Sequence, residues 1–522
     1  MMKRKVPFIP YNIVYALFTV CVFNASFLSQ LWGNVSWVAF GGVFVLLVIL
    51  YTALQLLIFG NRTIKFFSLL FLCANAVAAY FISTYHIALN KMMLSNVLDT
   101  NFFEATEWLG KSFWLYILFL CIVPAFLVIK VQIKVPGFKT RFKFFLSAIL
   151  LGGILSTPFM VYKKDVSIFL KENFNLKYQL VPSSYIYSLV SLVKNHLEEV
   201  RFIDSTKGLV QKKYWKGDKK NLLVFVLGES LREANFSLSN YERDTAEPLR
   251  KYEQDLVVFK KTMSCGVSTR VSLPCMFTAY SQNNYDERGI SYTSNALDIL
   301  QKSGLDVLWL DNELGCNKVC RNIPTEFTCD SRECVDSELN NVFKEKLPDL
   351  KEDAVVVLHQ RGSHGPRYDL REPEEFRKWT PYCQDADYQN CSYQEIVNAY
   401  DNSIYYTSFL LADLIETLSE AKDRYNPILI FISDHGESLG EDGFWGHGGK
   451  VEEAPRYQRE VPFFIWIPQS SRIALGMDKK CLDEKTKNTQ SHDAIFHSLL
   501  GLFGVKTDVY MPQLDIFSAC HP

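Results

Sequence analysis

Apolar residues are unevenly distributed along the chain, and the lengths of their runs divide it into two parts. Five long apolar stretches lie in the N-terminal part, at about 8–30, 36–59, 65–88, 113–131 and 144–162. Each is close to the roughly 20 residues that a helix needs to cross a bilayer. A basic start followed by an apolar run is also typical of a cleaved signal peptide, but the four further runs favour a retained first helix. The pattern therefore predicts a transmembrane anchor of five helices over residues 1–163.

The apolar runs of the second part are shorter and indicate strands. They are NLLVFVL (221–227), AVVVL (354–358) and PILIFIS (427–433), and segments with helical periodicity separate them. Short runs that are apolar at every position are typical of parallel strands buried on both faces. We expect residues 221–522 to form an α/β domain with a mainly parallel sheet.

Residues 164–220 connect the two parts, and we expect a bridging helical linker there. The segment 188–200 has helical periodicity with one apolar face. Such a helix suits the surface of a membrane, and it suits the surface of the soluble domain equally well. Both interpretations stay open at this point.

Charge follows the same division of the chain. Residues 1–160 hold 12 basic and 3 acidic side chains, whereas the rest of the chain holds 43 basic and 53 acidic ones. This split excludes a fully soluble enzyme, a disordered protein and a channel made of membrane helices alone. Basic residues precede helix one and occupy the loops between helices two and three and between helices four and five. Because cytoplasmic loops are enriched in Lys and Arg, we expect a cytoplasmic N-terminus and an extracytoplasmic second part.

The cysteines agree with that topology. Three of the 13, Cys21, Cys73 and Cys121, fall in predicted membrane helices, and the other ten follow residue 260. An oxidising compartment favours disulfides between such clustered cysteines. Eight of them form close sequence pairs: Cys265 with Cys275, Cys316 with Cys320, Cys329 with Cys334, and Cys383 with Cys391. Cys481 and Cys520 remain as a candidate fifth pair. A zinc cluster is the weaker alternative, because the spacings differ from the C-x2-C type.

Each of the three predicted strands ends in residues that can bind a metal or an anion. Glu229 follows the first strand, His364 lies shortly after the second, and Asp434 and His435 follow the third. A lone carboxylate after a strand is usually a helix cap. Three such ends in one domain favour a shared site instead, because ligands bind beyond the carboxyl ends of parallel strands. Carboxylate oxygens combined with an imidazole nitrogen indicate zinc rather than calcium.

The segment between Cys265 and Cys275 is the candidate source of a nucleophile. A disulfide would close it into a tight loop that holds a hydroxyl against the metal. Zinc can lower the pKa of a hydroxyl and so activate it for attack. Ser268, Thr269 and Ser272 are all candidates on chemical grounds, and a polar loop with helix-capping hydroxyls is an equally good interpretation of the segment.

Four motifs at these positions resemble the phosphoethanolamine transferases, a family with a catalytic domain of the alkaline phosphatase/sulfatase type. The motifs are Gly228-Glu229-Ser230, Ser-Cys-Gly-x-x-Thr269 ending in Pro-Cys-Met-Phe, His-Gln-x-Gly-Ser-His364-Gly-Pro, and Ser-Asp434-His435-Gly-Glu-Ser-Leu-Gly-Glu. The resemblance extends over nearly the whole chain. It implies that Thr269 is the nucleophile and a zinc ligand, with Glu229, Asp434 and His435 as the other ligands. It also implies that His364 and His447 lie near the donor phosphate or bind a second zinc ion. We expect His359, His492 and His497 to be structural.

The same resemblance implies an activity and its partners. Phosphoethanolamine would pass from phosphatidylethanolamine, through a covalent adduct of Thr269, to lipopolysaccharide. The expected acceptor is a phosphate of lipid A, with core heptose or Kdo as alternatives. The expected result is a less negative cell surface and resistance to polymyxin. The resemblance places the chain in the bacterial inner membrane with a periplasmic catalytic domain, and we expect a monomer that binds no nucleic acid.

Two further segments are candidates for substrate binding. Asn96, Thr100 and Glu104 are spaced i, i+4, i+8, so they would line one face of a helix, and the resemblance places such a row against the ethanolamine headgroup. Taken alone, this row would be a solvated helix face. The second segment, 311–320, departs from the family pattern: relatives carry serine and lysine where Leu314 and Asn317 fall, and Lys318 is displaced by one position.

Three other functions fit the sequence less well. A sulfatase requires a Cys/Ser-x-Pro-x-Arg segment, which the residues after Cys265 do not provide. A related phosphodiesterase stays an alternative, whereas the motifs and the cysteines argue against a glycerol-phosphate transferase that builds lipoteichoic acid. A receptor or scaffold would require broken metal ligands, and all of them are intact in this sequence.

Overall fold

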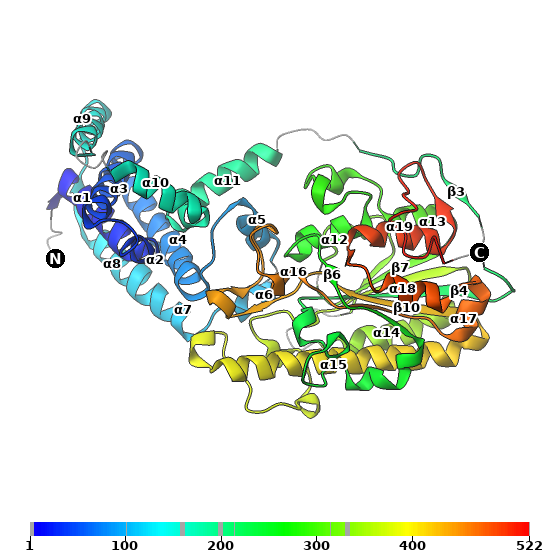
Figure 1. Cartoon of the computed structure of the whole chain (residues 1–522). Coiled ribbons are helices and arrows are strands. Elements are labelled where there is room, and N and C mark those ends of the chain that lie inside the picture. The colour runs from blue at the N-terminus through cyan, green and yellow to red at the C-terminus, as the bar shows by residue number, and fades with distance from the viewer. Residues whose placement is uncertain are drawn as a thin grey trace. The chain divides into compact units, whose positions relative to one another are not determined.

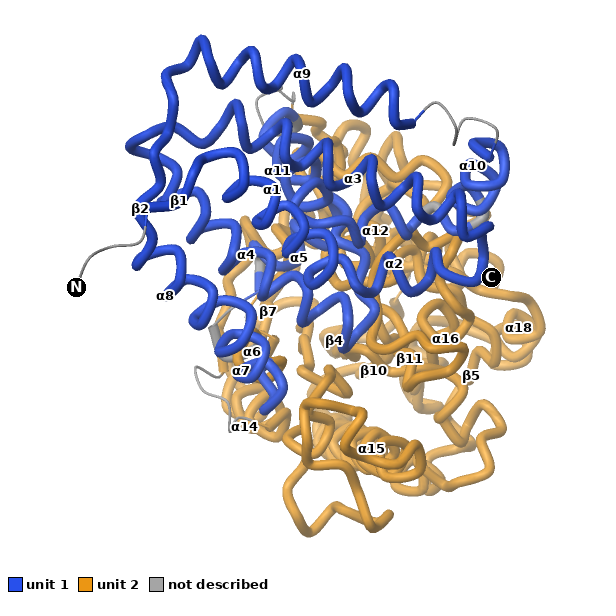
Figure 2. The backbone as a smooth tube through the Cα atoms, turned by 90° about the vertical axis from the view of Figure 1, so that its left-hand side faces the viewer, with its two compact units in different colours: residues 1–100, 109–198 blue, residues 101–108, 199–522 orange. Residues whose placement is uncertain are grey.

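The computed structural model describes residues 5–100, 102–156, 162–196, 202–212, 215–313, 315–328 and 335–520. The chain forms two compact units, which Figure 2 colours separately. Unit 1 comprises residues 1–100 and 109–198, and unit 2 comprises residues 101–108 and 199–522. The short segment 101–108 therefore belongs to unit 2, although both of its neighbours in the chain belong to unit 1. Leu314, Cys329 and Cys334, which the sequence analysis singled out, lie outside the described residues.

Unit 1 is helical, as its long apolar runs predict. Three of its helical segments are long and apolar enough to cross a membrane: α3 (Trp37–Ile58), α4 (Ile64–Tyr85) and the continuous segment Lys111–Lys130. A fourth span results if the bent pair Phe8–Phe23 and Ala25–Leu31, which meet at 68°, is counted as one. The predicted fifth run begins in α9 (Phe138–Ser156), which is not among these candidate spans in the described part of the chain. The helical anchor is thus supported by three or four candidate spans among the described residues, and the fifth predicted span stays a prediction.

Large apolar side chains cover the outside of these helices. Trp114, Phe119, Leu127 and Leu150 are each more than half exposed. Water would penalise such a surface, whereas lipid chains solvate it without cost. Backbone polar groups are satisfied inside the helices, which is the condition for spanning a bilayer.

The bridging region is helical and groups with unit 1. It contains α10 (Lys163–Glu172) and α11 (Ser183–His196). The Ser188 hydroxyl on α11 donates a 2.9 Å hydrogen bond to the carbonyl of Leu89. The segment predicted as helix at 188–200 is therefore helical up to His196, and its contacts group it with unit 1.

Unit 2 is built on a seven-stranded sheet with the strand order β5-β13-β10-β4-β9-β7-β8. All neighbouring pairs from β10 to β8 are parallel, and β13 runs antiparallel to both β10 and β5. The three predicted strands are its centre: β10 (Tyr425–Ser433), β4 (Lys220–Gly228) and β9 (Ala354–His359). The outer strands are β7 (Asp306–Asp311), β8 (Thr325–Phe327), β13 (Phe463–Trp466) and β5 (Leu256–Phe259).

Helices cover both faces of this sheet (Figure 1). On one side lie α12 (Thr269–Phe277), α13 (Ala296–Lys302) and α19 (Asp493–Leu502), whose apolar side chains share one buried cluster with β4, β9 and β10. The other side carries α14 (Ser337–Lys346) and the long α15 (Tyr393–Glu420). Burial on both faces explains why the central strands are apolar at nearly every position.

Four disulfides lie in the described part of unit 2. They join Cys265 to Cys275, Cys316 to Cys320, Cys383 to Cys391, and Cys481 to Cys520. The first three pairs were predicted from their spacing in the sequence. The last, Cys481 with Cys520, is the additional pair that the sequence offered as a candidate. Cys21, Cys73 and Cys121 are free thiols in unit 1, as expected.

Candidate metal centre and catalytic site

The candidate site forms where the central strands end. Gly228 of β4 pairs with Ser433 of β10, so the residues that follow them, Glu229 and Asp434, emerge next to each other. The backbone N–H of Ser230 donates a 3.1 Å hydrogen bond to Oδ1 of Asp434, and this bond links the two turns. The loop after β9 packs against the same place, since the N–H of Ser363 donates a 2.9 Å hydrogen bond to the carbonyl of Glu229.

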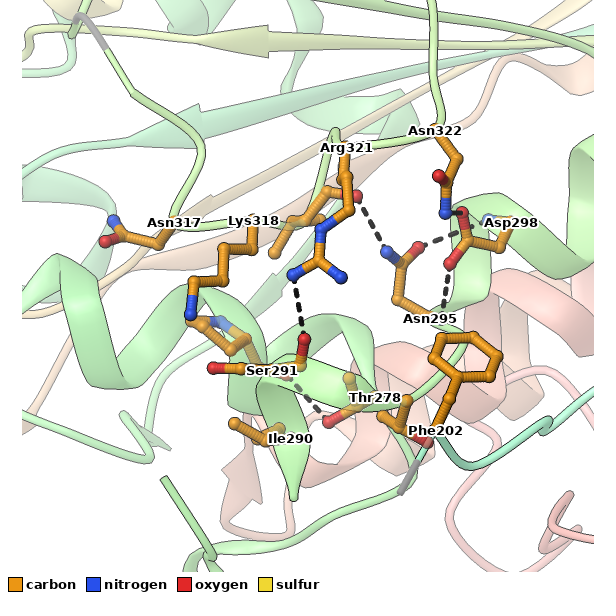
Figure 3. A pocket seen from close by; sticks show the side chains of 13 residues that line it. Phe202, Thr278, Ile290, Ser291, Asn295, Asp298, Asn317, Lys318, Arg321 and Asn322 are labelled. Carbon is orange, nitrogen blue, oxygen red and sulfur yellow. Dashed lines mark hydrogen bonds between the residues drawn. The ribbon is translucent and has the colours of Figure 1, made fainter. Parts of the chain in front are cut away.

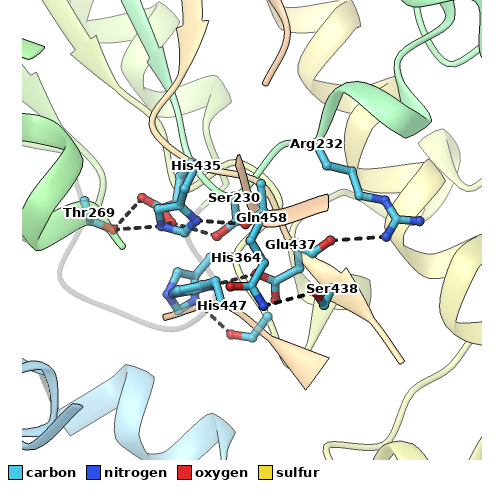
Figure 4. A network of polar contacts seen from close by, with 12 residues as sticks. Ser230, Arg232, Thr269, His364, His435, Glu437, Ser438, His447 and Gln458 are labelled. Carbon is cyan, nitrogen blue, oxygen red and sulfur yellow. Dashed lines mark hydrogen bonds and ion pairs between the residues drawn. The ribbon is translucent and has the colours of Figure 1, made fainter. Parts of the chain in front are cut away.

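Three buried ligand groups and one hydroxyl meet at this junction. Nε2 of His435 lies 3.1 Å from Oδ2 of Asp434, 3.3 Å from Oε1 of Glu229 and 3.4 Å from Oγ1 of Thr269. The Thr269 hydroxyl also donates a 3.0 Å hydrogen bond to Oε2 of Glu229. Figure 4 shows Thr269 and His435 facing each other across this network. Glu229, Asp434 and His435 are wholly buried, whereas Thr269 is partly exposed and open to a substrate.

The donor set fits a zinc ion. Nδ1 of His435 donates a 2.9 Å hydrogen bond to the carbonyl of Gly436, which leaves Nε2 directed at the carboxylates. Oδ2 of Asp434 is buried and lies 3.1 Å from Nε2 of His435. Ligand atoms of Glu229, Asp434 and His435 lie within 4.8 Å of one another. Carboxylates and imidazoles are ligand types that zinc binds, and catalytic zinc sites take three protein ligands and keep a fourth position open.

The buried charges of these side chains also favour the binding of a cation. Burial and the neighbouring Glu229 carboxylate raise the pKa of Asp434 to about 8. Burial alone lowers the pKa of His435, but Asp434 and Glu229 outweigh it and raise that pKa to about 10. A buried proton on His435 is thus the charge that the two carboxylates require. A divalent cation satisfies the same requirement more fully, with His435 neutral.

Among the three candidate hydroxyls, that of Thr269 is the one that contacts the candidate metal ligands in the described structure. Thr269 is the first residue of α12, and its side chain reaches the two metal-site residues described above. The hydroxyls of Ser268 and Ser272 are buried and have no hydrogen-bond partner among the described residues. The Cys265–Cys275 disulfide ties the loop to its helix, and His492 accepts a 3.2 Å hydrogen bond from the N–H of Cys265.

The structure brings His364 and His447 to the same site. Their ring centroids are 5.5 Å apart, and the rings of His447 and His435 are 4.1 Å apart. Ligand atoms of Glu229, His364 and His447 lie within 4.8 Å of one another, so a second ion has a donor set here. Nδ1 of His364 donates to the carbonyl of Gly365, and burial lowers the pKa of this ring to about 3. His364 is therefore neutral at pH 7, with Nε2 as its acceptor.

Sequence analysis did not assign a role to Glu437. Its Oε2 accepts a 2.6 Å hydrogen bond from Nδ1 of His447, and its Oε1 accepts one of 2.9 Å from the Tyr368 hydroxyl. A carboxylate on Nδ1 fixes the orientation of an imidazole and directs Nε2 at its target. The signal was present in the sequence, because Glu437 follows Asp434 and His435 in the same motif.

The other predicted histidines have structural partners. Nε2 of His492 donates to the carbonyl of Ser433, and burial lowers its pKa to about 3. Nδ1 of His359 lies 3.0 Å from Oδ2 of Asp311, inside the sheet. Nδ1 of His497 accepts a hydrogen bond from the N–H of Met511. Each contact ties together segments that are distant in the sequence or consolidates the core.

Lys318 lies at a separate small cavity of about 20 Å³, shown in Figure 3. Its ammonium group is 5.7 Å from the centre of the Tyr292 ring, and burial together with Arg321 lowers its pKa. None of the four predicted zinc ligands lines this cavity. Asn317 and Lys318 both adopt positive φ angles, 45° and 72°, inside the Cys316–Cys320 disulfide loop.

The row of Asn96, Thr100 and Glu104 does not lie on one continuous helix, contrary to the prediction. Helix α5 ends at Asp99, Thr100 has an extended backbone, and α6 (Phe102–Glu107) begins after it. The Thr100 hydroxyl donates a 2.9 Å hydrogen bond back to the carbonyl of Asn96, which satisfies the helix end. The i, i+4, i+8 argument therefore fails at Thr100. The side chain of Glu104 lies outside the described part of the structure.

Comparison with known proteins finds two family models and several relatives that match this chain. Residues 221–505 match the family model described as "Sulfatase", and residues 43–197 match that described as "Phosphoethanolamine transferase EptA/EptB". Phosphoethanolamine transferase EptA of Escherichia coli K12 is 34% identical over 86% of this chain and 84% of its own length. Phosphatidylethanolamine transferase Mcr-1 of Escherichia coli is 31% identical, over 90% of this chain and 89% of its own.

A solved structure covers nearly the whole chain. The integral membrane protein lipooligosaccharide phosphoethanolamine transferase A from Neisseria meningitidis superposes with a TM-score of 0.94 at 30% identity. The match covers 99% of this chain and 100% of that one, so it includes both the helical unit and the sheet. With the strand-end site in place on that fold, the chain belongs to the phosphoethanolamine transferase family.

Proposed function

We propose that this chain transfers phosphoethanolamine from phosphatidylethanolamine to lipopolysaccharide by double displacement, with Thr269 as the nucleophile. The observation that carries the proposal is the position of the Thr269 hydroxyl, which contacts both Glu229 and His435 and is partly exposed. A covalent intermediate divides one transfer between two bulky lipids into two steps that need not hold both lipids at once.

In the first step, Oγ1 of Thr269 forms a bond to the phosphorus of the donor. The bond between that phosphorus and the glycerol oxygen breaks, and the oxygen leaves as diacylglycerol after it takes up a proton. The Thr269 proton passes first to Glu229, which already accepts it in a hydrogen bond. Nε2 of His364 or His447 lies in position to bind the phosphoryl group or to relay the proton.

In the second step, an oxygen of the acceptor attacks the same phosphorus. The bond to Oγ1 breaks, Thr269 regains a proton, and phosphoethanolamine is left on the acceptor. Glu437 keeps the His447 ring oriented through both steps, because it holds the Nδ1 proton. Lys318 and the row Asn96, Thr100 and Glu104 are the proposed headgroup contacts.

We assign one zinc ion to Glu229, Asp434, His435 and Thr269, and a second ion to the region of His364 and His447 during turnover. When bound, zinc supplies a Lewis acid that lowers the pKa of a hydroxyl and offsets negative charge on the phosphoryl oxygens. The convergence of buried ligand atoms from Glu229, Asp434 and His435 supports this assignment.

A phosphate of lipid A is the proposed acceptor. The related structure from Neisseria meningitidis is named for lipooligosaccharide, and core heptose or Kdo are the alternatives within the same class of lipid. Each transfer adds a primary amine and reduces the negative charge of the surface. A less anionic surface attracts cationic peptides such as polymyxin less strongly.

The proposed location is the bacterial inner membrane, with the N-terminus in the cytoplasm and the catalytic part in the periplasm. Residues 1–163 form the anchor, with α9 as its fifth span, residues 164–220 form the bridge, and residues 221–522 form the catalytic domain. Lys and Arg in the predicted cytoplasmic loops support the orientation, and the disulfides support an oxidising compartment. We propose a monomer.

The test is intact-mass measurement of the purified full chain after incubation with phosphatidylethanolamine alone. We expect a gain of one phosphoethanolamine that maps to Thr269, together with release of diacylglycerol. Thr269→Ala should abolish both, and Thr269→Ser should retain partial activity because it keeps the hydroxyl. Ser268→Ala is the matched control and should still form the adduct. An adduct on Ser268, or turnover by Thr269→Ala, would refute the assignment of the nucleophile.

A further inference from the structure

The segment 101–108 carries a buried acid that the proposed mechanism does not use. Glu107 is the last residue of α6, and its side chain is only 1% exposed. Both of its carboxylate oxygens accept charged hydrogen bonds from guanidinium groups. Oε1 accepts one of 2.7 Å from Nη2 of Arg361, and Oε2 accepts one from Nη2 of Arg371. These partners follow Glu107 by 254 and 264 residues in the sequence.

Both arginines are hydrogen-bonded to the backbone of His364. The Nε group of Arg371 donates a 2.8 Å hydrogen bond to the carbonyl of His364. The N–H of His364 donates a 3.2 Å hydrogen bond to the carbonyl of Arg361. His364 is therefore held from both sides by residues whose side chains end on one carboxylate, that of Glu107.

The charge balance of this cluster depends on Glu107. Arg361 and Arg371 are 8% and 1% exposed, and both buried guanidinium groups bond directly to the buried carboxylate of Glu107. Burial and the neighbouring Arg371 lower the pKa of Arg361, whereas acidic neighbours that include Glu107 raise it. A buried charge that loses its partner is strongly unfavourable, and the backbone must move to let water reach it.

The residue after Glu107 touches the second histidine segment. A Cβ added to Gly446 would lie 3.7 Å from the indole of Trp108. Gly446 directly precedes His447, and both belong to unit 2 together with segment 101–108. One short segment thus bonds to the His364 loop through Glu107 and brings Trp108 close to the His447 loop.

We propose that Glu107 is a positioning residue of the active site: it sets the backbone at His364 by clamping Arg361 and Arg371. This inference rests on the proposed function only for its effect on rate, because the clamp itself is a structural claim. It also gives segment 101–108 a role, since the His364 loop reaches its working geometry only with this segment in place.

The experiment uses the full chain in detergent and three variants at this position. Glu107→Gln removes the charge and keeps the size of the side chain. Glu107→Asp keeps the charge but is too short to reach both arginines. Glu107→Gln combined with Arg361→Met restores the net charge of the cluster without restoring the clamp. Glu416→Gln is the matched control, because Glu416 forms an exposed ion pair with Lys251 at 3.2 Å.

Hydrogen exchange at residues 361–371 is the first readout. We expect Glu107→Gln to accelerate exchange there by about tenfold or more, and to leave exchange at 228–232 and at 433–436 unchanged. Bound zinc, measured by metal analysis, should stay at the native level. Unchanged exchange at 361–371 in both Glu107→Gln and Glu107→Asp would overturn the proposal, whether or not the chain is a transferase.

Kinetics of diacylglycerol release separate positioning from stability. We expect kcat of Glu107→Gln to fall by about 10- to 100-fold with KM within about twofold of native, as for a misplaced catalytic group. In the double variant, the melting temperature should recover while kcat stays low. Recovery of kcat together with stability would show that Glu107 only stabilises the fold. If Glu107→Gln does not accumulate, Glu107→Asp carries the same comparison. No release by the native chain would instead refute the proposed function.

Discussion

At the scale of single residues, substitution of Glu229 tests the metal centre most directly. Glu229→Gln keeps the shape of the side chain but removes one of the two anionic ligands, so we expect loss of most of the bound zinc and of activity. Metal analysis of the purified full chain measures this, and the variant should still insert into the membrane. Glu352→Gln, which alters an exposed pair with Lys220, is the control. Native zinc content with full activity would remove Glu229 from the site.

The raised pKa of Glu233, a residue away from the metal site, predicts how the stability of the fold varies with pH. Burial and the nearby Glu460 raise the pKa of Glu233 from 4.5 to about 7. A carboxyl group whose pKa is higher in the folded state holds its proton more tightly there. Stability is therefore complete below about pH 4.5 and declines as the pH rises through 7.

Glu233→Gln removes that decline. Because Glu233 is partly exposed, we expect a gain of only about 1 kcal/mol at pH 8, or roughly 2 °C in melting temperature, and little gain at pH 4.5. Thermal unfolding of the full chain in detergent across this range measures the difference. Equal melting temperatures of the native chain and the variant at pH 8 would contradict the argument.

At the scale of elements, the loop after β9 depends on close packing at Gly362. This residue has φ +52°, and an added Cβ would lie 2.6 Å from the carbonyl oxygen of Glu229 and 2.9 Å from its nitrogen. Gly362→Ala must therefore push the loop away from the end of β4. We expect a loss of about 1–3 kcal/mol in stability, together with lower zinc content and a lower transfer rate.

Gly304→Ala is the matched control for that change. Gly304 also has a positive φ, +89°, but nothing lies within 4 Å of the added Cβ. It should reduce the melting temperature through backbone strain while zinc content and transfer stay native. If Gly362→Ala binds zinc and transfers like Gly304→Ala, the packing of this loop against Glu229 does not matter for the site.

At the scale of the whole molecule, the proposed transfer of phosphoethanolamine from one lipid to another can be tested in cells. Mass spectrometry of lipid A and of the core oligosaccharide, from cells with and without this chain, identifies the acceptor. We expect a mass gain of one phosphoethanolamine on lipid A and none on the core. The Thr269→Ala variant is the matched control and should give no gain on either. A gain on the core alone would move the acceptor to heptose or Kdo, and no gain anywhere would refute the transferase.

Elements defined by short sequence windows could be predicted from the sequence. The runs that became α3, α4, β4, β9 and β10 were recognisable because spanning helices and buried strands are determined by local length and apolarity. Glu229, Asp434 and His435 could be placed together for a similar reason, since the carboxyl ends of parallel strands share one edge. Close cysteine pairs such as Cys383 and Cys391 needed only their spacing.

Only the tertiary structure decided between groups that look alike in sequence. Thr269, Ser268 and Ser272 are equivalent hydroxyls until the fold directs one of them at Glu229. Likewise, the i, i+4, i+8 spacing from Asn96 gives no sign that α5 ends at Asp99 and that the backbone of Thr100 is extended. The contact of Glu107 with Arg361 joins residues 254 apart, and only long-range packing brings them together. Sequence alone therefore determined the elements and the edge where they meet. The tertiary contacts determine which side chains meet there, because they join segments that are far apart in the sequence.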